Sequence, residues 1–374
     1  MADGKELEAW LSLNPRAGLS AAAVRRLLAA FGSPQAVLDA GPGAWREVGG
    51  ADAAKALAQP SDLAQQIVEQ GLHWQAHTPG AQVIALGEAA YPPALFQTAD
   101  PPFLLFCRGR VALLQQPSLA VVGSRHATAQ GIEHARAFSH YLSDAGLCIV
   151  SGLAAGIDGA AHEGGLRGRG STIAVMGTGP EQLYPRRHQG LGERIAQEGL
   201  LLTEFAPGTP PLPANFPQRN RIIAGLSLGT LVVEAAVQSG SLITARLASE
   251  CGREVFAIPG SIHSPVAKGC HRLIQQGAKL VETGEDVLQE LRAQTALLGP
   301  RSQPEAKPLP PSREEPPVSD PVLAALGQDP MSLDSLVART GWPASVLSAK
   351  LLELELSGLV ARLPGGFFQR CGQA

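Results

Sequence analysis

The sequence predicts an α/β protein whose central part is a doubly wound parallel sheet. Short apolar runs recur between residues 119 and 257, and segments with apolar residues at helical spacing separate most of them. The runs at 119–122 and 147–150 each end in a turn of small residues, VVGSR and SGLAAG, that leads into a helical pattern. Parallel strands need such crossover helices, so the alternation indicates a βαβα arrangement.

The two turns are the first candidate sites. Each lies where the carboxyl end of a strand meets the amino end of a helix, and the unpaired N–H groups and positive helix dipole there suit a phosphate. The first turn adds the hydroxyl of Ser124 and the planar cation of Arg125. The second supplies Gly152 and Gly156, which allow a ligand close to the backbone. For Asp158 and the nearby His162, helix capping and internal hydrogen bonds are the favoured interpretation.

A helical module precedes the sheet. Apolar residues recur at helical spacing over four segments, 6–13, 20–31, 34–40 and 51–57. Ser20 fits an N-cap and Gly32 fits a helix stop. Short helices separated by glycines resemble a helix-hairpin-helix or sterile-alpha-motif module, which we place at 1–75. A packing role and contact with DNA or a partner protein both stay open for this module, because its few arginines do not decide between them.

The sheet core is expected over 76–292. Val83–Leu86 and Phe103–Arg108 are predicted as the first strands that lead into the sheet. The six further predicted strands are Leu119–Val122, Leu147–Val150, Thr172–Val175, Leu200–Thr203, Thr230–Val233 and Glu254–Ala257.

A linker and a small domain are predicted after the core. Residues 293–318 are rich in Pro, Ser and charge, which is typical of a disordered linker. Residues 319–374 show three helical patterns and then ARLPGGFFQR, a two-strand wing, in the order of a winged helix. Its expected recognition helix, 344–358, sets Lys350 against Glu353 and Glu355. A helix that enters the major groove needs net positive charge, so protein contact or regulation is favoured over DNA readout.

Composition excludes several classes of protein. The net charge is −3 over 374 residues, so contact with a polyanion must come from a local patch. The five cysteines form no C-x-x-C pair, which indicates reduced thiols rather than disulfides or a zinc site. The amino terminus has no apolar signal-peptide core and no apolar run is long enough to cross a membrane, so we expect a cytoplasmic protein.

No cofactor is expected. VVGSRHATAQG does not match G-x-G-x-x-G, and LCIVSG has no acidic residue at its end to hold a ribose. The chain also lacks the ATP-type phosphate loop, the G-x-S-x-G elbow and the His and Cys spacings of common metal sites.

The strongest local signal is PANFPQRNRIIAGLS. Phe216, Arg219, Asn220 and Arg221 fall within six positions just before an apolar helical stretch. Proteins that bind single strands combine cations along the backbone with aromatic rings that stack on bases. A helix start held by salt bridges is the alternative interpretation.

Two more segments contribute candidates. QSGSLITA, after Glu234, is a hydroxyl-rich turn in which Ser239, Gly240, Ser241 and Thr244 are suited to hydrogen bonds with phosphates. In GTGPEQLYPRRH, Tyr184 precedes two arginines. Stacking on a base and filling a core gap stay equally open for Tyr184.

Taken together, these motifs resemble the DNA-processing protein A family, DprA or Smf. VVGSR, SGLAAGIDGAAH, TIAVMGTG with YP, FPQRNRIIAGLS, VVEAAVQSGSLITA, AIPG and GCHRLIQQGA occur in the family's order and cover most of the chain. The resemblance implies an extended Rossmann core that forms a homodimer through its carboxyl-terminal part. It also implies a non-enzymatic cytoplasmic protein that binds single-stranded DNA, protects incoming strands and loads RecA on them during natural transformation and homologous recombination. The implied single-strand contacts are Ser124, Arg125, Gly152, Leu153, Ala154, Gly156, Phe216, Arg219, Asn220, Arg221, Ser239, Gly240, Ser241 and Thr244.

Two rival hypotheses remain at this point. The first is an enzyme, a nucleotide phosphoribohydrolase on a similar Rossmann variant, with Glu234 as acid and base. Its family uses Gly-Gly-x-Gly-Thr-x-x-Glu, whereas here the glutamate stands one residue too far from Gly229 and Thr230 and the preceding glycine pair is missing. The second is a nucleotide-sensing regulator whose winged helix contacts DNA.

Overall fold

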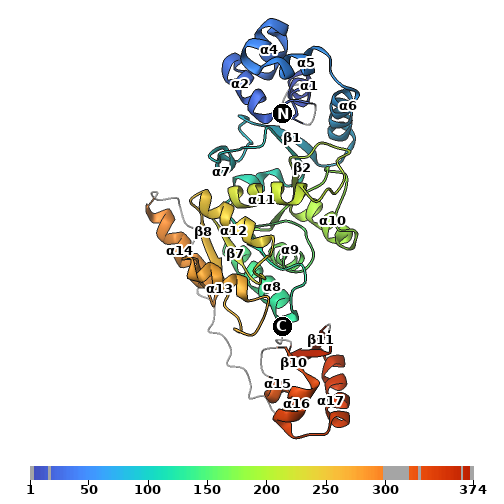
Figure 1. Cartoon of the computed structure of the whole chain (residues 1–374), viewed down its shortest axis with the longest axis vertical. Helices are drawn as coiled ribbons and strands as arrows, with labels where there is room; N and C mark the ends of the chain where they lie inside the picture. Colours follow the sequence, from blue (N-terminus) through green and yellow to red (C-terminus); the bar gives the residue numbers. More distant parts are fainter. Residues whose placement is uncertain (1–3, 16–17, 298–319, 327–329, 364, 371–374) are drawn as a thin grey trace.

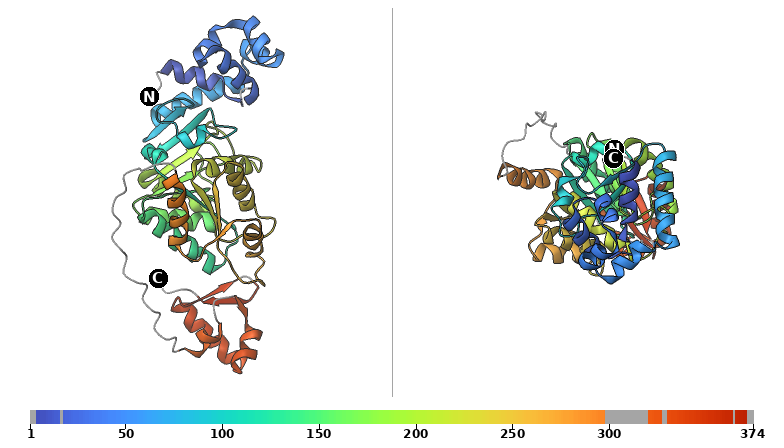
Figure 2. Two further views of the ribbon diagram at one scale, coloured as in Figure 1. Left: turned by 90° about the vertical axis from the view of Figure 1, so that its left-hand side faces the viewer. Right: turned by 90° about the horizontal axis from the view of Figure 1, so that it is seen from above.

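The computed structural model describes residues 4–15, 18–297, 320–326, 330–363 and 365–370. Three parts follow one another along its longest axis: a helical module, a central sheet with helices on both faces, and a small carboxyl-terminal domain (Figure 1). The views in Figure 2 show the same order from two further directions.

The central sheet has nine strands in the order β1-β2-β6-β5-β4-β3-β7-β8-β9. β1 pairs antiparallel with β2 and β2 antiparallel with β6, and all other neighbours are parallel. The strands are β1 Ala81–Ala85, β2 Leu104–Gly109, β3 Ser118–Val122, β4 Cys148–Ser151, β5 Thr172–Val175, β6 Leu200–Thr203, β7 Gly229–Val232, β8 Glu254–Ala257 and β9 Lys279–Leu280. The predicted doubly wound parallel sheet is confirmed, and the strand order reverses between β3 and β7.

Helices cover both faces of this sheet because successive residues of each strand point to opposite sides. Ala120 and Val122 of β3 pack with α11 to α13, whereas Leu119 and Val121 pack with α8, α9 and α14. α10 packs beside α9 over β5 and β6. These helices are α8 Ala129–Asp144, α9 Ile157–Arg167, α10 Gln189–Glu198, α11 Asn215–Leu226, α12 Ser241–Glu250, α13 Lys268–Gln275 and α14 Gly284–Leu297.

The helical module consists of α1 Gly4–Ser12, α2 Ala21–Phe31, α3 Pro34–Asp39, α4 Gly41–Gly49, α5 Ala51–Ala58 and α6 Asp62–His77. Ser20 caps α2 by accepting the Ala23 N–H, and Gly32 ends it with a positive φ, as the sequence predicts. The module shares a hydrophobic core with the β1–β2 hairpin, in which Trp74 meets the edge of Phe106. A short helix, α7 Pro93–Phe96, follows β1.

The carboxyl-terminal domain is a winged helix, as predicted. Its elements are α15 Pro321–Leu326, β10 Met331–Ser332, α16 Leu333–Thr340, α17 Ala344–Leu356, β11 Val360–Leu363 and β12 Phe367–Arg370. β12 lies between β10 and β11, so the predicted two-strand wing gains a third, short strand. The domain touches the core where Gln369 of β12 donates to Gln130 of α8.

The predicted start of the linker shifts, and three elements appear that the sequence did not predict. α14 continues to Leu297, so the first residues of the predicted linker 293–318 are helical, and the remainder lies outside the described residues. The two-residue strand β9 was not predicted, and neither were α4 and α6.

Candidate nucleic-acid interface

A groove opens at the carboxyl ends of the strands, beside the reversal between β3 and β7. In open α/β sheets this is where ligands bind. Its volume is about 430 Å³. Its lining comes from the turns after β3, β4 and β7, together with α11 and the start of α12. Ten of the fourteen predicted contact residues line it: Ser124, Arg125, Ala154, Phe216, Arg219, Asn220, Ser239, Gly240, Ser241 and Thr244.

Hydrogen bonds fix the backbone of the first turn, after β3, and leave its arginine side chain free. The Ser124 N–H donates to the Glu234 carbonyl oxygen at 2.7 Å, and the Ser124 hydroxyl accepts the His126 N–H. Arg125 is exposed, and its side chain makes no hydrogen bond or ion pair with any residue that the structure describes. Its charge is therefore available to a ligand in the groove.

The N–H groups of the second turn, after β4, are already bound by side chains of the protein. The Asp158 carboxylate accepts the N–H groups of Gly152 and Ala154, and His162 Nε2 accepts that of Leu153. Gly152, Leu153 and Gly156 do not line the groove. The capping interpretation of Asp158 and His162 therefore agrees with the structure, and the three N–H groups are already used.

Backbone strain in this turn explains why so many groups hold it. Leu153 has a φ of 56°, in the left-handed region that few non-glycine residues adopt. Its N–H is bound by His162 and its carbonyl oxygen accepts from His188 Nδ1 at 3.0 Å. Gly156 also has a positive φ, and a Cβ there would collide with the Ser124 carbonyl oxygen of the first turn. The two turns therefore pack directly against each other.

His162 is neutral and fully buried. The Thr172 hydroxyl donates to the Ile149 carbonyl oxygen, so it accepts from His162 Nδ1, and Nε2 is left as an acceptor. Burial lowers the pKa of His162 to about 3, with His188 and Arg219 adding to the shift. Protonation of Nε2 would remove the acceptor that holds the strained turn.

Arg219 lies at the floor of the groove. It is buried, and its Nη1 donates to the carbonyl oxygens of Gly152 and Val175. Burial lowers the pKa of Arg219 to about 10, and the nearby Asp158 opposes this shift. A Cβ at residue 152 would collide with the guanidinium, so the glycine is required here for close packing. Arg219 thus joins the turn after β4 to the carboxyl end of β5.

A row of stacked groups starts in the groove, where Arg125 and Phe216 line it, and Tyr184 extends the row beyond the lining. The Arg125 guanidinium lies over the Phe216 ring, 5.7 Å from its centre, and the Tyr184 ring lies 5.6 Å from Phe216 at 45°. Tyr184 is exposed, so it is not a core filler. The row offers a cation and aromatic faces side by side, which is the arrangement that stacks on unpaired bases.

Two further arginines follow Tyr184 in the chain. Arg186 and Arg187 begin the short helix η3 Arg186–His188, which the His188 bond to Leu153 fixes beside the second turn. Both are exposed, and neither forms an ion pair within the described part of the chain. The sequence prediction did not include them among the contacts, although the pattern of Tyr184 followed by two arginines is visible in the chain.

The turn before α12 forms the opposite wall. The hydroxyls of Ser239 and Ser241 lie 2.7 Å apart, and Gly240 is exposed at the helix start. His126 and Gln238 also line the groove and were not predicted. The hydroxyl, amide and backbone groups among them can donate hydrogen bonds, which suits phosphate or sugar oxygens.

Arg221 lies outside the groove. Its guanidinium is paired with Glu204 and lies 3.5 Å from the Asp100 carboxylate, which also binds Arg25 of the helical module. It therefore matches the salt-bridged interpretation that the sequence left open for this helix.

Glu234 has a structural partner. Its carboxylate accepts the N–H of Thr128 at 2.9 Å and the Thr128 hydroxyl at 2.5 Å, at the amino end of α8. Burial raises its pKa. Glu234 does not line the groove, so the groove contains no carboxylate at the position that the enzyme hypothesis assigns to it.

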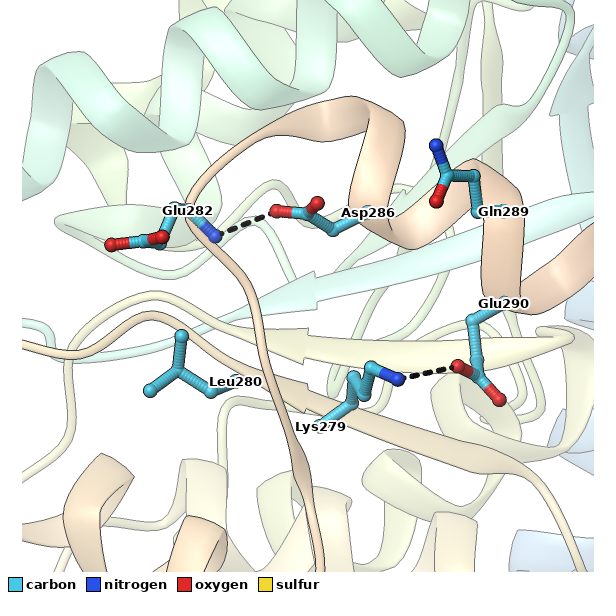
Figure 3. A pocket seen from close by; sticks show the side chains of 6 residues that line it. All are labelled: Lys279, Leu280, Glu282, Asp286, Gln289 and Glu290. Atoms are coloured by element: carbon cyan, nitrogen blue, oxygen red, sulfur yellow. Dashed lines mark hydrogen bonds and ion pairs between the residues drawn. The ribbon is translucent and has the colours of Figure 1, made fainter.

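A second cavity, of about 390 Å³, lies between β9 and α14 (Figure 3). Lys279 pairs with Glu290 at 3.0 Å, and Asp286 accepts the N–H groups of Glu282 and Thr283. Its lining is acidic and its only cation is already paired, so it does not suit a polyanion.

The described residues contain neither a metal-binding cluster nor a membrane span. Among them, no cluster of three or more His, Cys, Asp or Glu side chains is arranged to hold a metal ion. No helix within those residues has the length and apolarity that a membrane span needs.

The fold and the groove define a Rossmann-like protein with a groove at the carboxyl edge of its sheet and a carboxyl-terminal winged helix. Comparison with known families gives the particular family. Residues 82–292 match the model of DNA recombination-mediator protein A, and residues 304–366 match that of the DprA winged helix domain. The chain belongs to this family, and the resemblance drawn from its sequence motifs is confirmed.

Individual relatives support the same assignment. Protein Smf of Escherichia coli is 43% identical over 310 residues, which cover 80% of each chain. DNA processing protein DprA of Streptococcus pneumoniae is 51% identical over 200 residues, which cover 54% of this chain and 71% of that protein.

Two solved structures are also similar. The X-ray structure of DprA from Streptococcus pneumoniae has a TM-score of 0.67 at 39% identity and covers 76% of this chain and 97% of its own. A structure of DNA processing protein A from Helicobacter pylori, described in terms of that protein's single-stranded DNA binding mode, has a TM-score of 0.52 at 29% identity. It covers 57% of this chain and 97% of its own.

Proposed function

We propose that the groove binds single-stranded DNA and that the protein is a recombination mediator. The observation that carries this proposal is the free guanidinium of Arg125 stacked on Phe216 in a groove at the switch point of the sheet, with the exposed Tyr184 ring against Phe216 at its edge. Aromatic faces bind bases only where the bases are unpaired, so the row favours a single strand over a duplex. The Helicobacter pylori relative, which is described as binding single-stranded DNA, supports the same conclusion.

We further propose that the protein protects incoming strands and loads RecA on them during natural transformation and homologous recombination. Membership of the recombination-mediator family supports this role. It is tested by measuring RecA-dependent ATP hydrolysis on oligo-dT in the presence of a single-strand-binding protein. We expect the parent protein to shorten the lag before hydrolysis, and an unchanged lag would contradict the mediator role.

A non-catalytic role fits the position of Glu234, whose carboxylate is held by Thr128 and lies outside the groove. The competing phosphoribohydrolase is tested by incubating the protein with nucleoside monophosphates and measuring free base. We expect no release above the buffer control. Release that Glu234→Gln abolishes would establish the enzyme instead.

The homodimer implied by the family is proposed to form at the β9 edge of the sheet. β9 is the last strand in the order, and Leu280 on it is 43% exposed. An exposed apolar residue on an open strand edge favours association. Leu280→Glu is expected to lower the mass measured by light scattering, and an unchanged mass would contradict this interface.

The site itself is tested by charge reversal. Arg125→Glu should weaken binding of labelled oligo-dT by about tenfold or more, because it removes a cation–π pair and a phosphate partner. The matched control is Arg246→Glu, because Arg246 is 80% exposed and lies outside the groove. Fluorescence anisotropy at constant salt measures both variants, and equal affinities for them would contradict the site assignment.

A further inference from the structure

Helix α17 of the winged helix has two different faces. Leu347, Leu351 and Leu354 are buried in the core of the domain. On the other side, Leu352 is 57% exposed and Leu356 is 82% exposed. Figure 1 shows α17 on one flank of the domain, with α15 and α16 on its inner side. A helix that is apolar on both faces is normally covered on both, so the outer face indicates a contact.

This outer face does not suit DNA. The Lys350 ammonium of α17 is 3.3 Å from the Asp320 carboxylate and 3.0 Å from that of Glu353. Glu353 and Glu355 lie in the same half of the helix. Across the described residues of the domain, four cations are matched by four carboxylates. A phosphate backbone therefore finds no excess positive charge here.

The spacing of the exposed residues fits another helix. Ser345, Ala349, Leu352 and Leu356 are all exposed and follow one another at intervals of four, three and four residues. This is the a/d spacing of a two-helix seam. Small residues occupy its first half and leucines its second half.

The order of small and large side chains selects the partner. In an antiparallel pair of identical α17 helices, Leu352 meets Ala349 of the second copy and Leu356 meets Ser345, so each large side chain meets a small one. A parallel pair would place leucine against leucine at one end and leave a gap at the other.

Charge selects the same arrangement. Glu353 and Glu355 stand near the carboxyl end of α17. An antiparallel pair brings these carboxylates beside the amino end of the second helix, where the dipole is positive, whereas a parallel pair brings four carboxylates together.

We propose that the outer face of α17 is a second self-association surface, which binds α17 of another copy of this chain in antiparallel register. It is separate from the β9 edge. If the dimer proposed at that edge also forms, each chain carries two different self-contacts, and together these build assemblies larger than a dimer. Molecules linked in this way would lie next to one another along a single strand.

The test measures the mass of the full chain by analytical ultracentrifugation at several concentrations. The variant is Leu352→Glu combined with Leu356→Glu. Both residues are exposed, so the fold is expected to tolerate the change. The matched control is Leu63→Glu on α6, where the leucine is 55% exposed. Each variant is also made together with Leu280→Glu, which isolates α17 from the β9 edge.

We expect the chain with Leu280→Glu to associate reversibly and the α17 double variant to abolish that association, while Leu63→Glu leaves it unchanged. If the β9 edge makes no contact, the α17 double variant alone gives monomers. Failure of the dimer at the β9 edge is therefore distinguished from failure of the contact at α17. The same mass with and without the α17 changes, in both backgrounds, would overturn the proposal.

Cross-linking tests the register directly. Ser345→Cys together with Leu356→Cys should give an intermolecular disulfide on mild oxidation, because the two positions face each other between copies. Leu356→Cys alone should give no more cross-link than the parent chain, which controls for the native cysteines. Cross-linking by Leu356→Cys alone to the same extent as by the pair would overturn the antiparallel register.

Discussion

At the scale of single residues, the two groove arginines have different tasks. Arg125 makes no hydrogen bond or ion pair with any residue that the structure describes and lies over the Phe216 ring, so its charge stays available in the groove. Arg219 is buried and donates to two backbone carbonyls, so it holds the turn after β4 against the end of β5. Loss of Arg125 should therefore affect binding, and loss of Arg219 should affect folding first.

Phe216→Ala should weaken oligo-dT binding by about 1–3 kcal/mol, which is the typical contribution of one aromatic ring stacked on a base. The matched control is Phe96→Ala, since Phe96 is exposed on α7 and does not line the groove. Fluorescence anisotropy gives both affinities. A loss of the same size for Phe96→Ala would show that the effect is not specific to the groove.

Arg219→Ala should lower the free energy of unfolding by about 3–5 kcal/mol. The change leaves two carbonyl oxygens without donors and the buried Asp158 carboxyl without its nearby cation. Urea unfolding measures the effect, and Arg125→Ala, an exposed change, should stay within about 0.5 kcal/mol of the parent. Equal stability of the two variants would contradict the structural role of Arg219.

The sequence could locate the Arg-rich segment but not separate its arginines. Phe216, Arg219 and Asn220 are three and four residues apart, so they share one face of α11 and line the groove. Arg221 is two residues from Arg219, which places it on another face, where it meets Glu204. Helical spacing alone could have made this distinction. Arg186 and Arg187 have no ion-pair partner among the described residues. This depends on how segments far apart in the sequence pack, which a single sequence does not show.

At the scale of elements, the turn after β4 depends on a neutral histidine. The pKa of His162 is about 3 in the folded protein, against about 6.5 in an unfolded chain. Below pH 6.5 the unfolded state therefore binds a proton that the folded state does not bind. The stability that neutral His162 contributes is fully present above pH 6.5 and is lost as the pH falls towards 3.

Lowering the pH from 6.5 to 5 should cost about 2 kcal/mol of stability through this one group, at about 1.4 kcal/mol per pH unit. Urea unfolding of the parent and of His162→Gln at both pH values isolates the effect, because glutamine does not titrate. The parent should lose about 2 kcal/mol more than the variant over this range. Equal losses would contradict a buried neutral His162.

Strands were predictable where a short apolar run is bounded by residues typical of turns. β5, β6 and β8 begin and end at the predicted residues. β9 has only two residues, both exposed, so it carries no apolar run to detect. The N–H groups of the second turn were expected to bind a ligand, but Asp158 and His162 come back to them from the following helix, and sequence alone does not place those acceptors.

At the scale of the whole molecule, the winged helix and the central sheet have separate hydrophobic cores. Their contact includes the pair Gln130 and Gln369, and each part has its own buried cluster. The groove lies entirely in the core, so binding of a single strand should not require the winged helix.

Deletion of 319–374 should leave the affinity for a short oligo-dT, long enough for one groove, within about threefold of the parent. A regulator that contacts DNA through its winged helix would lose binding altogether, which separates the two hypotheses. Anisotropy with the same labelled oligonucleotide gives the comparison, and the helical content by circular dichroism confirms that the core is folded.

A single strand in the groove is expected to lie along the row formed by Arg125, Phe216 and Tyr184. This is tested by ultraviolet cross-linking of oligo-dT to the parent protein, followed by mass spectrometry of the modified peptides. We expect thymine adducts on peptides that contain Phe216 or Tyr184. Adducts confined to the helical module or to the winged helix would contradict it.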